Sequence, residues 1–321
     1  MAQKLTTCTF CGVGCGLYLE TAGGRIVGAY PSMSHPTNRG RICLRGWHVH
    51  EVAGSPDRLL RPLIRGSSGF REVSWDEAVS FISERLRDII ERHGPDATAF
   101  LNSPRCSNEE AYLLQKLARS VVGTNNVDHG TGVYVHNSID ALQDMLGIPA
   151  TTNPVGDLAL SDLILVDGVD LARQTPTVGG VVMRAKLAGA RLIVVDPRRH
   201  RLAEHADIHL RVRPGTETVL YGAMAKVIVD RGLTASGFVK AHCDGVHACL
   251  EAIARYDLLS AAEACDVAAA DIETAAVAFA EASAAAQSSA RERRVRPHAS
   301  HLVIPACRWR GPTPSSSLHL A

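Results

Sequence analysis

The chain has 321 residues, of which 46% are apolar and 21% charged, and its formal net charge is +1. This composition is that of an ordinary globular protein of two or three domains, and the near-neutral charge argues against nucleic acid as a partner. No apolar segment is long enough to cross a bilayer and no secretory signal precedes residue 8, so we expect a cytoplasmic protein without membrane insertion. Nine cysteines in such a chain suggest a reducing compartment, with thiols acting as ligands or core residues.

Four cysteines near the start have the spacing C-x2-C-x3-C-x27-C; they are Cys8, Cys11, Cys15 and Cys43. Four thiolates gathered in this way can hold an iron–sulfur cluster or a zinc ion, and the spacing alone does not separate the two. The glycines between them allow the backbone to pass close to a metal centre. Disulfides are the weakest alternative in a reducing compartment.

The next elements predict a small hairpin followed by one strand between two capped helices. Strands are expected at 17–20 and 25–28 around a Gly-Gly turn. A capping box at 74–77 predicts a helix through residue 90, and a second box at 107–110 predicts a helix ending at Gly123. A buried strand is expected between the helices at 97–101. A strand followed by a capped helix is half of a βαβ unit.

From about residue 150 the pattern predicts a doubly wound α/β fold with a parallel sheet. The expected elements are strands at 162–168, 191–198 and 208–212, a helix at 181–188, and a helix after 216 that Thr216 caps. A ligand of such a sheet should lie beyond the carboxyl ends of its strands, near 168–173, 196–198 and 214–217.

The composition changes at Gln287, after which Arg, Pro, Ser and His follow without any apolar period. We expect this tail to be disordered, or to be read from an altered frame. The predicted domains are therefore an iron–sulfur domain at 1–60, an α/β lobe at 61–150, a doubly wound α/β lobe at 151–286 and a tail at 287–321.

Several segments, in order, resemble the large catalytic subunit of the molybdopterin oxidoreductase family, especially its formate dehydrogenase and nitrate reductase branch. They are CTFCGVGCG with CLRG, SPRCSNEEAY (103–112), GTNNVDHGTGV (123–133) and VDPRRHRLAEHADIHLRVRPGTE (195–217). The resemblance covers residues 5 to about 286. Because the family's catalytic subunit is much longer, the chain resembles its N-terminal half and looks truncated.

The resemblance implies a [4Fe–4S] cluster on the four cysteines and a molybdenum or tungsten bis(molybdopterin guanine dinucleotide) cofactor. Arg45 occupies the position of a lysine that lies between cluster and pterin in many relatives; the alternative is a solvated arginine. Arg105, Asn108 and Glu109 would border the cofactor, although simple helix capping explains the same segment.

By the same resemblance, strand-end residues would hold the guanosine and pyrophosphate parts of the cofactor; they are Asp170, Asp196, Arg198, Gly215 and Glu217. The alternative for each charged residue among them is an ordinary surface charge. Related chains often carry an acidic residue and a histidine where this chain has Arg173 and Thr175.

The largest departure from the family concerns the metal ligand. Relatives carry a Cys or selenocysteine six residues after the Asp of their NNVD-like motif, and this chain has Tyr134 there. Tyr134 would be a phenolate ligand, or the metal has no protein ligand, and His136 would carry protons. The alternative is that both are ordinary loop residues.

The resemblance therefore implies an oxidoreductase like formate dehydrogenase, which passes electrons from a small-molecule substrate, formate first, through the cluster to an electron-transfer partner. A non-catalytic iron–sulfur subunit, like the large subunit of complex I, is the alternative, and a truncated inactive product is a third reading.

Overall fold

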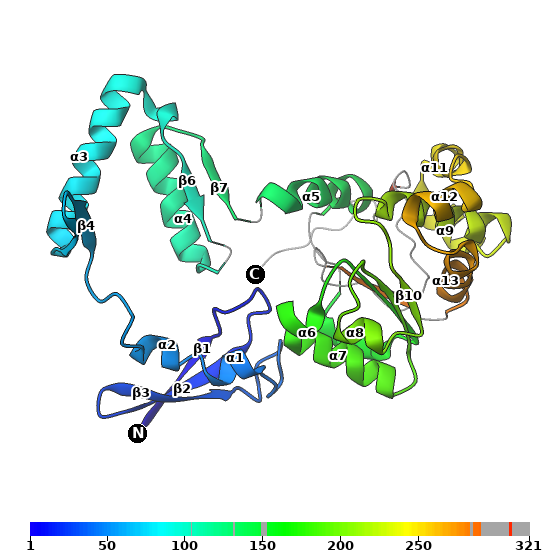
Figure 1. Ribbon diagram of the computed structural model, residues 1–321, viewed down its shortest axis with the longest axis horizontal. Helices are drawn as coiled ribbons and strands as arrows, with labels where there is room; N and C mark the ends of the chain where they lie inside the picture. The colour runs from blue at the N-terminus through cyan, green and yellow to red at the C-terminus, as the bar shows by residue number, and fades with distance from the viewer. Residues whose placement is uncertain (104, 131, 149–152, 283–284, 290–307, 310–321) are drawn as a thin grey trace. The chain divides into compact units, whose positions relative to one another are not determined.

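The computed structural model describes residues 1–103, 105–130, 132–148, 153–282, 285–289 and 308–309. The chain forms two compact units, Met1–Tyr134 and Val135–Ala321 (Figure 1). The boundary between them falls inside the lobe 61–150 that the sequence predicts as one domain. The four predicted domain limits themselves stay predictions.

The first unit begins with an antiparallel sheet of three strands in the order β1-β2-β3. The strands are β1 (Ala2–Thr7), β2 (Gly16–Ala22) and β3 (Arg25–Pro31). The predicted hairpin is confirmed, and its two turn glycines have φ of 55° and 75°. Strand β1 was not predicted, because its residues are all exposed and its order comes from pairing with β2. Two short helices follow, α1 (Leu44–Trp47) and α2 (Glu51–Gly54).

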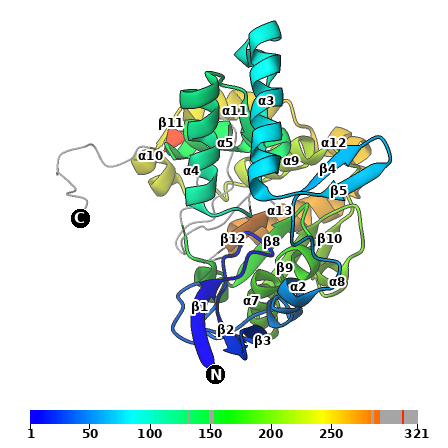
Figure 2. The same cartoon turned by 90° about the vertical axis from the view of Figure 1, so that its left-hand side faces the viewer.

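A hairpin of β4 (Leu63–Gly66) and β5 (Gly69–Glu72) precedes the long helix α3 (Trp75–His93), as Figure 2 shows. Ser74 caps α3 as predicted, since its hydroxyl accepts a hydrogen bond from the Glu77 N–H at 3.1 Å. The other half of the predicted box is replaced by an ion pair, in which the Glu77 carboxylate accepts from Arg71 at 2.5 Å. Gly94 ends the helix with φ of 82°.

The rest of the first unit contains a two-stranded parallel sheet of β6 (Phe100–Asn102) and β7 (Val127–His129). The strand predicted from residue 97 starts later, because Pro95–Ala97 forms the 3-10 turn η1. Helix α4 (Asn108–Lys116) has a complete capping box, as predicted, between Ser107 and Glu110. It continues as the π-helical turn η2 (Leu117–Val122) and ends at Gly123. Helix α5 (Gly132–Leu146) crosses the boundary between the units.

The second unit contains a parallel sheet in the order β10-β9-β8-β12. The strands are β8 (Leu163–Asp167), β9 (Arg191–Val195), β10 (Ile208–Leu210) and β12 (Ala285–Ser289). The first three strands are added in one direction and β12 joins the other side of β8. The chain therefore reverses between β8 and β12, which is the doubly wound arrangement that the sequence predicts.

Short and long helices connect these strands. After the 3-10 turn η3 (Val155–Leu160) they are α6 (Leu171–Gln174), α7 (Pro176–Leu187), α8 (Arg201–Glu204), α9 (Glu217–Asp230), α10 (Ser236–His242), α11 (Val246–Ala254), α12 (Leu258–Cys265) and α13 (Ala269–Glu281). Helix α7 starts earlier than predicted because Pro176 suits a first turn. The predicted side-chain cap of α9 is wrong: the Thr216 hydroxyl donates to the Arg213 carbonyl at 2.7 Å instead.

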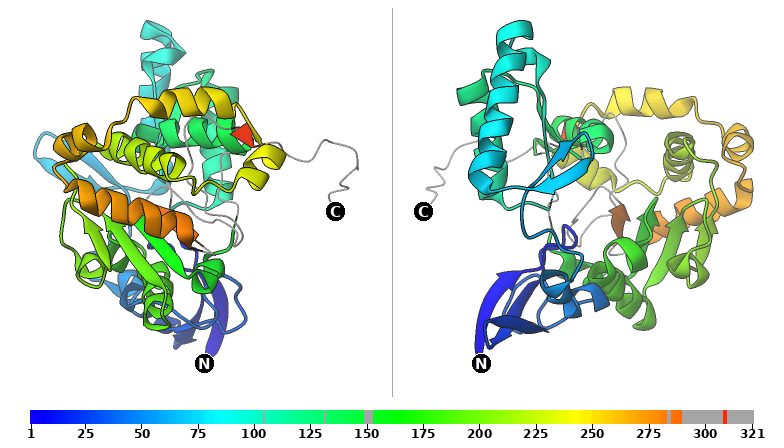
Figure 3. Two further views of the ribbon diagram at one scale, coloured as in Figure 1. Left: turned by 90° about the vertical axis from the view of Figure 1, so that its right-hand side faces the viewer. Right: turned by 60° about the vertical axis from the view of Figure 1, so that its left-hand side comes forward.

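The core of the second unit lies between the sheet and helices α9, α12 and α13. Alternate residues of β8 and β9, such as Leu163 and Ile193, face this core, as the two-residue period of a strand requires. Phe279 of α13 is 1% exposed and fills it from the helix side. The left view in Figure 3 shows α13, in orange, lying along the sheet.

The composition break predicted at Gln287 falls inside β12, which continues to Ser289. Its backbone is held by parallel pairing with β8, so disorder from residue 287 is wrong for these residues. Strand β13 (Arg308–Trp309) pairs antiparallel with β11 (Cys243–Asp244). The rest of the predicted tail, 290–307 and 310–321, lies outside the described residues. No helix in the described part of the chain combines the length and apolar character needed to cross a bilayer.

Candidate metal centre and ligand crevice

The first three cysteines lie on the loop between β1 and β2. The Cys8 N–H donates to the Cys15 carbonyl at 2.8 Å, which closes the loop on itself. Gly14 has φ of 68°, a conformation that favours glycine, and so allows this tight return. Cys15 is 6% exposed, while Cys8 and Cys11 are half-buried. The local backbone thus gathers three thiols in eight residues.

Cys11 and Cys43 lie close enough to Cys8 to influence its ionisation. Burial raises the pKa of the Cys8 thiol, the neighbouring Cys11 and Cys43 raise it further, and a backbone hydrogen bond with Phe10 offsets only part of this. A Cys8 thiolate is therefore disfavoured unless a cationic centre compensates its charge. This donor set fits an iron–sulfur cluster, whose irons take thiolate ligands.

Among the described residues, no three His, Cys, Asp or Glu side chains converge to hold a metal ion. The eight cysteines in that part of the chain all carry free thiols. The disulfide alternative is therefore wrong for the four predicted ligands.

The return loop to the fourth cysteine is tied to β2 by a buried asparagine. Asn38, 2% exposed, accepts from the Gly16 N–H at 2.8 Å and donates to the Gly16 carbonyl at 3.0 Å. The Asn38 side-chain amide therefore pairs with the Gly16 backbone as a residue of a neighbouring strand would. A Cβ on Gly16 would lie 2.3 Å from the ring of His35, so this position requires glycine. These contacts fix how the chain comes back to Cys43.

Cys43 is the N-terminal cap residue of α1, and its carbonyl accepts from the Gly46 N–H at 2.9 Å. This turn presents the half-buried Arg45, whose guanidinium carbon lies 4.6 Å from the centre of the Phe10 ring. The guanidinium carbon of Arg105 lies 5.5 Å from the same ring. Two of the predicted site arginines therefore meet at the cysteine loop.

The residues at the start of α4 cap the helix, as the sequence predicts. Ser107 and Glu110 cap each other's backbone N–H groups, at 3.2 and 2.7 Å. Asn108 and Glu109 are the exposed first residues of the helix. Capping therefore accounts for this segment, and a cofactor contact of Asn108 and Glu109 stays a prediction.

The alternative interpretation, in which Tyr134 and His136 are ordinary loop residues, is wrong for their backbones. Their backbones belong to the first turns of α5, because the helix begins at Gly132, three residues after the end of β7. Their side chains lie outside the described part of the structure, so their role stays a prediction.

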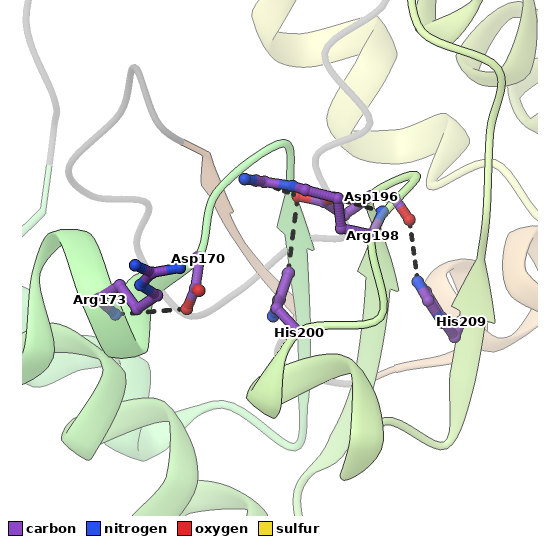
Figure 4. A network of polar contacts seen from close by, with 6 residues as sticks. All are labelled: Asp170, Arg173, Asp196, Arg198, His200 and His209. Carbon is purple, nitrogen blue, oxygen red and sulfur yellow. Dashed lines mark hydrogen bonds and ion pairs between the residues drawn. The ribbon is translucent and has the colours of Figure 1, made fainter.

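In the second unit, Asp196 directly follows β9 and is the centre of a polar network (Figure 4). Its carboxylate, 1% exposed, accepts from the Arg198 backbone N–H at 2.8 Å and from Nε and Nη2 of Arg198 at 3.1 Å each. The Nε2 atom of His200 lies 3.6 Å from Asp196 Oδ2. His209 Nε2 lies 2.9 Å from the Asp196 carbonyl oxygen. Neighbours on three sides thus fix this aspartate.

This network keeps Asp196 ionised. Burial alone would raise the pKa of its carboxyl, but the hydrogen bonds from Arg198 and the charges of Arg198 and His200 outweigh burial and hold the pKa below its usual value. The hydrogen bond and the charge of Asp196 raise the pKa of the Arg198 guanidinium, and the charge of Asp170 adds to this. Asp170 therefore belongs to the same electrostatic site.

Asp170 follows β8 and caps α6, since its carboxylate accepts from the Arg173 N–H at 3.3 Å. The side chain is buried, with the residue 7% exposed. Gly215, with φ of 89°, lies in the turn between β10 and α9, and Glu217 is the first residue of α9. The predicted crevice residues thus follow the carboxyl ends of three neighbouring parallel strands, and their contacts to a cofactor stay a prediction.

Sequence reasoning missed His200 and His209. The side chain of His200 is 6% exposed, and both its ring nitrogens are buried without a hydrogen-bond partner. Its spacing of four residues from Asp196 was the available signal. His209 lies on β10, where its position in the sequence is that of any strand residue.

Three cysteines on one loop, a fourth at the start of α1, and a doubly wound sheet with an anchored carboxylate after one strand are features typical of iron–sulfur proteins that also bind a nucleotide-like ligand. Residues 1–54 match the molybdopterin oxidoreductase Fe4S4 domain, and residues 58–304 match the molybdopterin oxidoreductase domain. The chain belongs to the molybdopterin oxidoreductase family.

Several curated relatives are formate dehydrogenases or their alpha subunits, and a nitrate reductase is also among the relatives. The F420-dependent formate dehydrogenase subunit alpha of Methanocaldococcus jannaschii is 38% identical over 82% of this chain and 38% of that protein. Formate dehydrogenase H of Escherichia coli is 35% identical over 89% of this chain and 41% of that protein. The chain thus spans about two fifths of the length of these relatives.

Among solved structures, acetylene hydratase from Pelobacter acetylenicus superposes with a TM-score of 0.75 and 28% identity, over 88% of this chain and 40% of that chain. The resemblance read from the sequence is confirmed. The two matching domains indicate a [4Fe–4S] cluster and a molybdenum or tungsten pterin cofactor in a family of oxidoreductases.

Proposed function

We propose that this chain is the cluster-bearing and nucleotide-holding portion of a molybdenum or tungsten pterin oxidoreductase resembling formate dehydrogenase. The observation that carries the proposal is the cysteine loop, in which Cys8 interacts with Cys11 and Cys43 and Cys15 closes the backbone turn. Several relatives are formate dehydrogenases and another is a nitrate reductase, which favours an oxidoreductase over an electron carrier alone.

In this proposal Cys8, Cys11, Cys15 and Cys43 ligate the cluster, and Arg45 lies beside it on α1. A guanidinium near the cluster stabilises its reduced, more negative state and donates hydrogen bonds toward the pterin. Arg105, which shares the Phe10 ring with Arg45, brings the start of α4 to the same place. Asn108 and Glu109 would then border the cofactor.

Asp196 and Arg198 would hold the nucleotide part of the cofactor. The ionised Asp196 carboxylate accepts hydrogen bonds from a base edge or from ribose hydroxyls. Arg198 is bound to Asp196 through Nε and Nη2, and its side chain is 62% exposed, so its remaining N–H groups are available to a phosphate. Asp170, Gly215 and Glu217 would complete this crevice.

When bound, the metal and its pterins supply the two-electron chemistry and the cluster supplies one-electron transfer. The protein's part is to orient these groups and to exclude water. The first substrate that we propose is formate, and the proposed partner is an electron-transfer protein or subunit. Tyr134 and His136 would lie next to the metal as ligand and proton carrier. The nine cysteines suit a reducing, cytoplasmic location.

Cofactor content and activity of the anaerobically purified chain test the proposal. We expect iron, molybdenum or tungsten, pterin fluorescence, and formate-dependent reduction of an artificial dye. Asp196→Asn should lower the pterin content, while Asp230→Asn, in an exposed i,i+4 pair with Lys226, should leave it unchanged. A chain that contains iron but neither pterin nor molybdenum or tungsten would be an electron carrier and not the proposed enzyme. Zinc without iron would contradict both.

One residue, Tyr134, favours an electron carrier as a second candidate function. Tyr134 stands where relatives carry the Cys or selenocysteine ligand of the metal. Tyr134→Cys separates the two functions: it should raise formate-dependent activity if a metal binds there, and it should change nothing in a chain that holds only the cluster.

A further inference from the structure

We propose that Phe10 is a positioning residue of the cluster loop, whose ring holds the guanidinium groups of Arg45 and Arg105 together beside the cysteines. By fixing these two positive charges, Phe10 raises the reduction potential of the cluster. This inference rests on the proposed role of Cys8, Cys11, Cys15 and Cys43 as cluster ligands.

The geometry is a ring shared by two cations from distant parts of the chain. Phe10 lies between Cys8 and Cys11 in sequence, so its backbone is part of the ligand loop. The guanidinium carbons of Arg45 and Arg105 lie 4.6 and 5.5 Å from its ring centre, both within the range of cation–π attraction.

This arrangement differs from the other cation–π contacts in the described residues. Those three join one arginine to one ring a few positions away on the same hairpin, helix or turn. They are Arg65 with Phe70, Arg85 with Phe81, and Arg255 with Tyr256. Among the cation–π contacts of the described residues, only the Phe10 ring joins two separate elements, α1 and the segment before α4.

Two like charges approach each other only if something compensates their repulsion. In the described part of the chain no carboxylate forms an ion pair with either guanidinium. The negative face of the Phe10 ring is the group that both contact. Removing the ring would release Arg45, which is half-buried, and Arg105, which is exposed, into solvent, where water and salt screen their charges.

The consequence concerns the electron that the cluster accepts. Reduction adds one electron and one negative charge to the cluster, with no bond made or broken in the protein. Nearby positive charges stabilise this state more than the oxidised one, and cluster potentials follow local charge and hydrogen bonding. A held pair of arginines therefore makes reduction easier than a mobile pair.

An EPR-monitored redox titration of the full chain, purified anaerobically and reduced stepwise with dithionite, tests this. Phe10→Leu removes the ring but keeps the apolar volume. At a fixed potential near the midpoint we expect about a threefold lower ratio of reduced to oxidised cluster, which is about 28 mV at 59 mV per tenfold for one electron. Phe10→Trp keeps an aromatic face and should restore the wild-type midpoint.

The matched control is Phe70→Leu, which removes a ring that contacts one guanidinium on the β4–β5 hairpin. It should leave the midpoint unchanged. In an Arg45→Gln, Arg105→Gln background, Phe10→Leu should add no further shift, because the charges that it positions are gone.

An unchanged midpoint in Phe10→Leu with full iron content would overturn the proposal, as would an equal shift in the double-Gln background. If Phe10→Leu does not retain the cluster, Arg105→Gln, outside the cysteine loop, must shift the midpoint to more negative values, and no shift there would also overturn it. A wild-type chain without iron would contradict the proposed cluster itself, whereas a normal wild-type titration with an unaltered Phe10→Leu contradicts only the role of Phe10.

Discussion

Apolar strands and capped helices are predicted from the sequence in both units, but the apolar side chains of the two units are buried to different degrees. In the second unit, strands β8 and β9 are buried on both faces and helices α9, α12 and α13 close one core over them. In the first unit, helices α3 and α4 leave large apolar side chains in solvent, among them Trp75 at 71% and Leu113 at 61% exposed. An apolar strand and a capped helix thus predict an element without predicting what covers its face.

The forces that order the two units differ accordingly. The first unit depends on local devices: the Asn38 amide on Gly16, the Ser107–Glu110 capping box, and the Thr124 hydroxyl that donates to Asp96 at 2.8 Å. The second depends on buried apolar area, which contributes in proportion to the surface removed from water. Substitutions should therefore act through burial in one unit and through hydrogen bonds and glycines in the other.

The largest effect is expected from Phe279→Ala in the second unit. Phe279 is 1% exposed in the α13 face of the core, so the cavity should cost about 3–5 kcal/mol of unfolding free energy. Hydrogen exchange of the α9 and α13 amides measures this loss. Leu113→Ala in α4 is the matched truncation, and at 61% exposure it should change stability by less than about 0.5 kcal/mol. Similar losses at both positions would remove the contrast between the units.

Asp196→Asn should have the next largest effect, because it removes the charge that Arg198 and His200 surround. Hydrogen bonds to charged groups contribute about 1.5–3 kcal/mol, so a loss in this range is expected near neutral pH. Asp230→Asn, in an exposed pair with Lys226, should cost no more than about 0.5 kcal/mol.

The pH dependence of Asp196→Asn gives a sharper test. The folded-state pKa of Asp196 lies below its ordinary value of about 3.9, so its stabilisation is fully present above that pH and is lost as pH falls through the lower folded value. The difference in unfolding free energy between the wild type and Asp196→Asn should therefore shrink on acidification below about pH 4. A difference that grows there would show that the carboxyl is not held ionised.

Gly16→Ala tests the first unit's dependence on close backbone packing. An added Cβ would lie 2.3 Å from the His35 ring, and such overpacking typically costs about 1–3 kcal/mol. We expect lower iron retention after anaerobic gel filtration, because the shift disturbs the Asn38 bridge between the two halves of the cysteine loop. Gly54→Ala, in open space within α2, should retain iron like the wild type.

The smallest effect is expected from the helix caps. Ser107→Ala removes the hydrogen bond that the Ser107 hydroxyl accepts from the Glu110 N–H and keeps the one that the Ser107 backbone N–H donates to the Glu110 carboxylate, and caps of this kind contribute about 1 kcal/mol. Exchange of the first amides of α4 should accelerate about fivefold. Ser74→Ala removes the equivalent hydrogen bond at the start of α3 and should accelerate its first amides by a similar factor. Unchanged exchange in both variants would mean that the cap hydroxyls add nothing.

Much of the fold was predictable because its signals are local. The buried strands β8 and β9, the helix limits at Gly94 and Gly123, and the Ser107 box all follow from nearby residues. Strand β1 was not predictable, since its polar residues are ordered only by pairing with β2. The same holds for β12, where pairing with β8 overrides a composition that suggested disorder.

In the candidate sites, too, some features follow from nearby residues in the sequence and others depend on tertiary structure. The four cysteines and the strand-end Asp170, Asp196 and Arg198 were predicted from motifs, from the family resemblance and from the rule for ligands of parallel sheets, and their roles stay predictions. The buried position of His200 beside Asp196, and the shared contact of Arg45 and Arg105 with Phe10, depend on tertiary structure. No spacing in the sequence brings residues 10 and 105 together.

The most direct test of the account is the iron content and EPR spectrum of the anaerobically purified chain, before and after dithionite reduction, with Cys43→Ser as the comparison. We predict about four iron atoms per chain and a signal that appears on one-electron reduction, both lost or strongly diminished in Cys43→Ser because one of four thiolate ligands is removed. Zinc in place of iron, or iron content and a spectrum that Cys43→Ser leaves unchanged, would contradict the assignment of the cluster to these four cysteines.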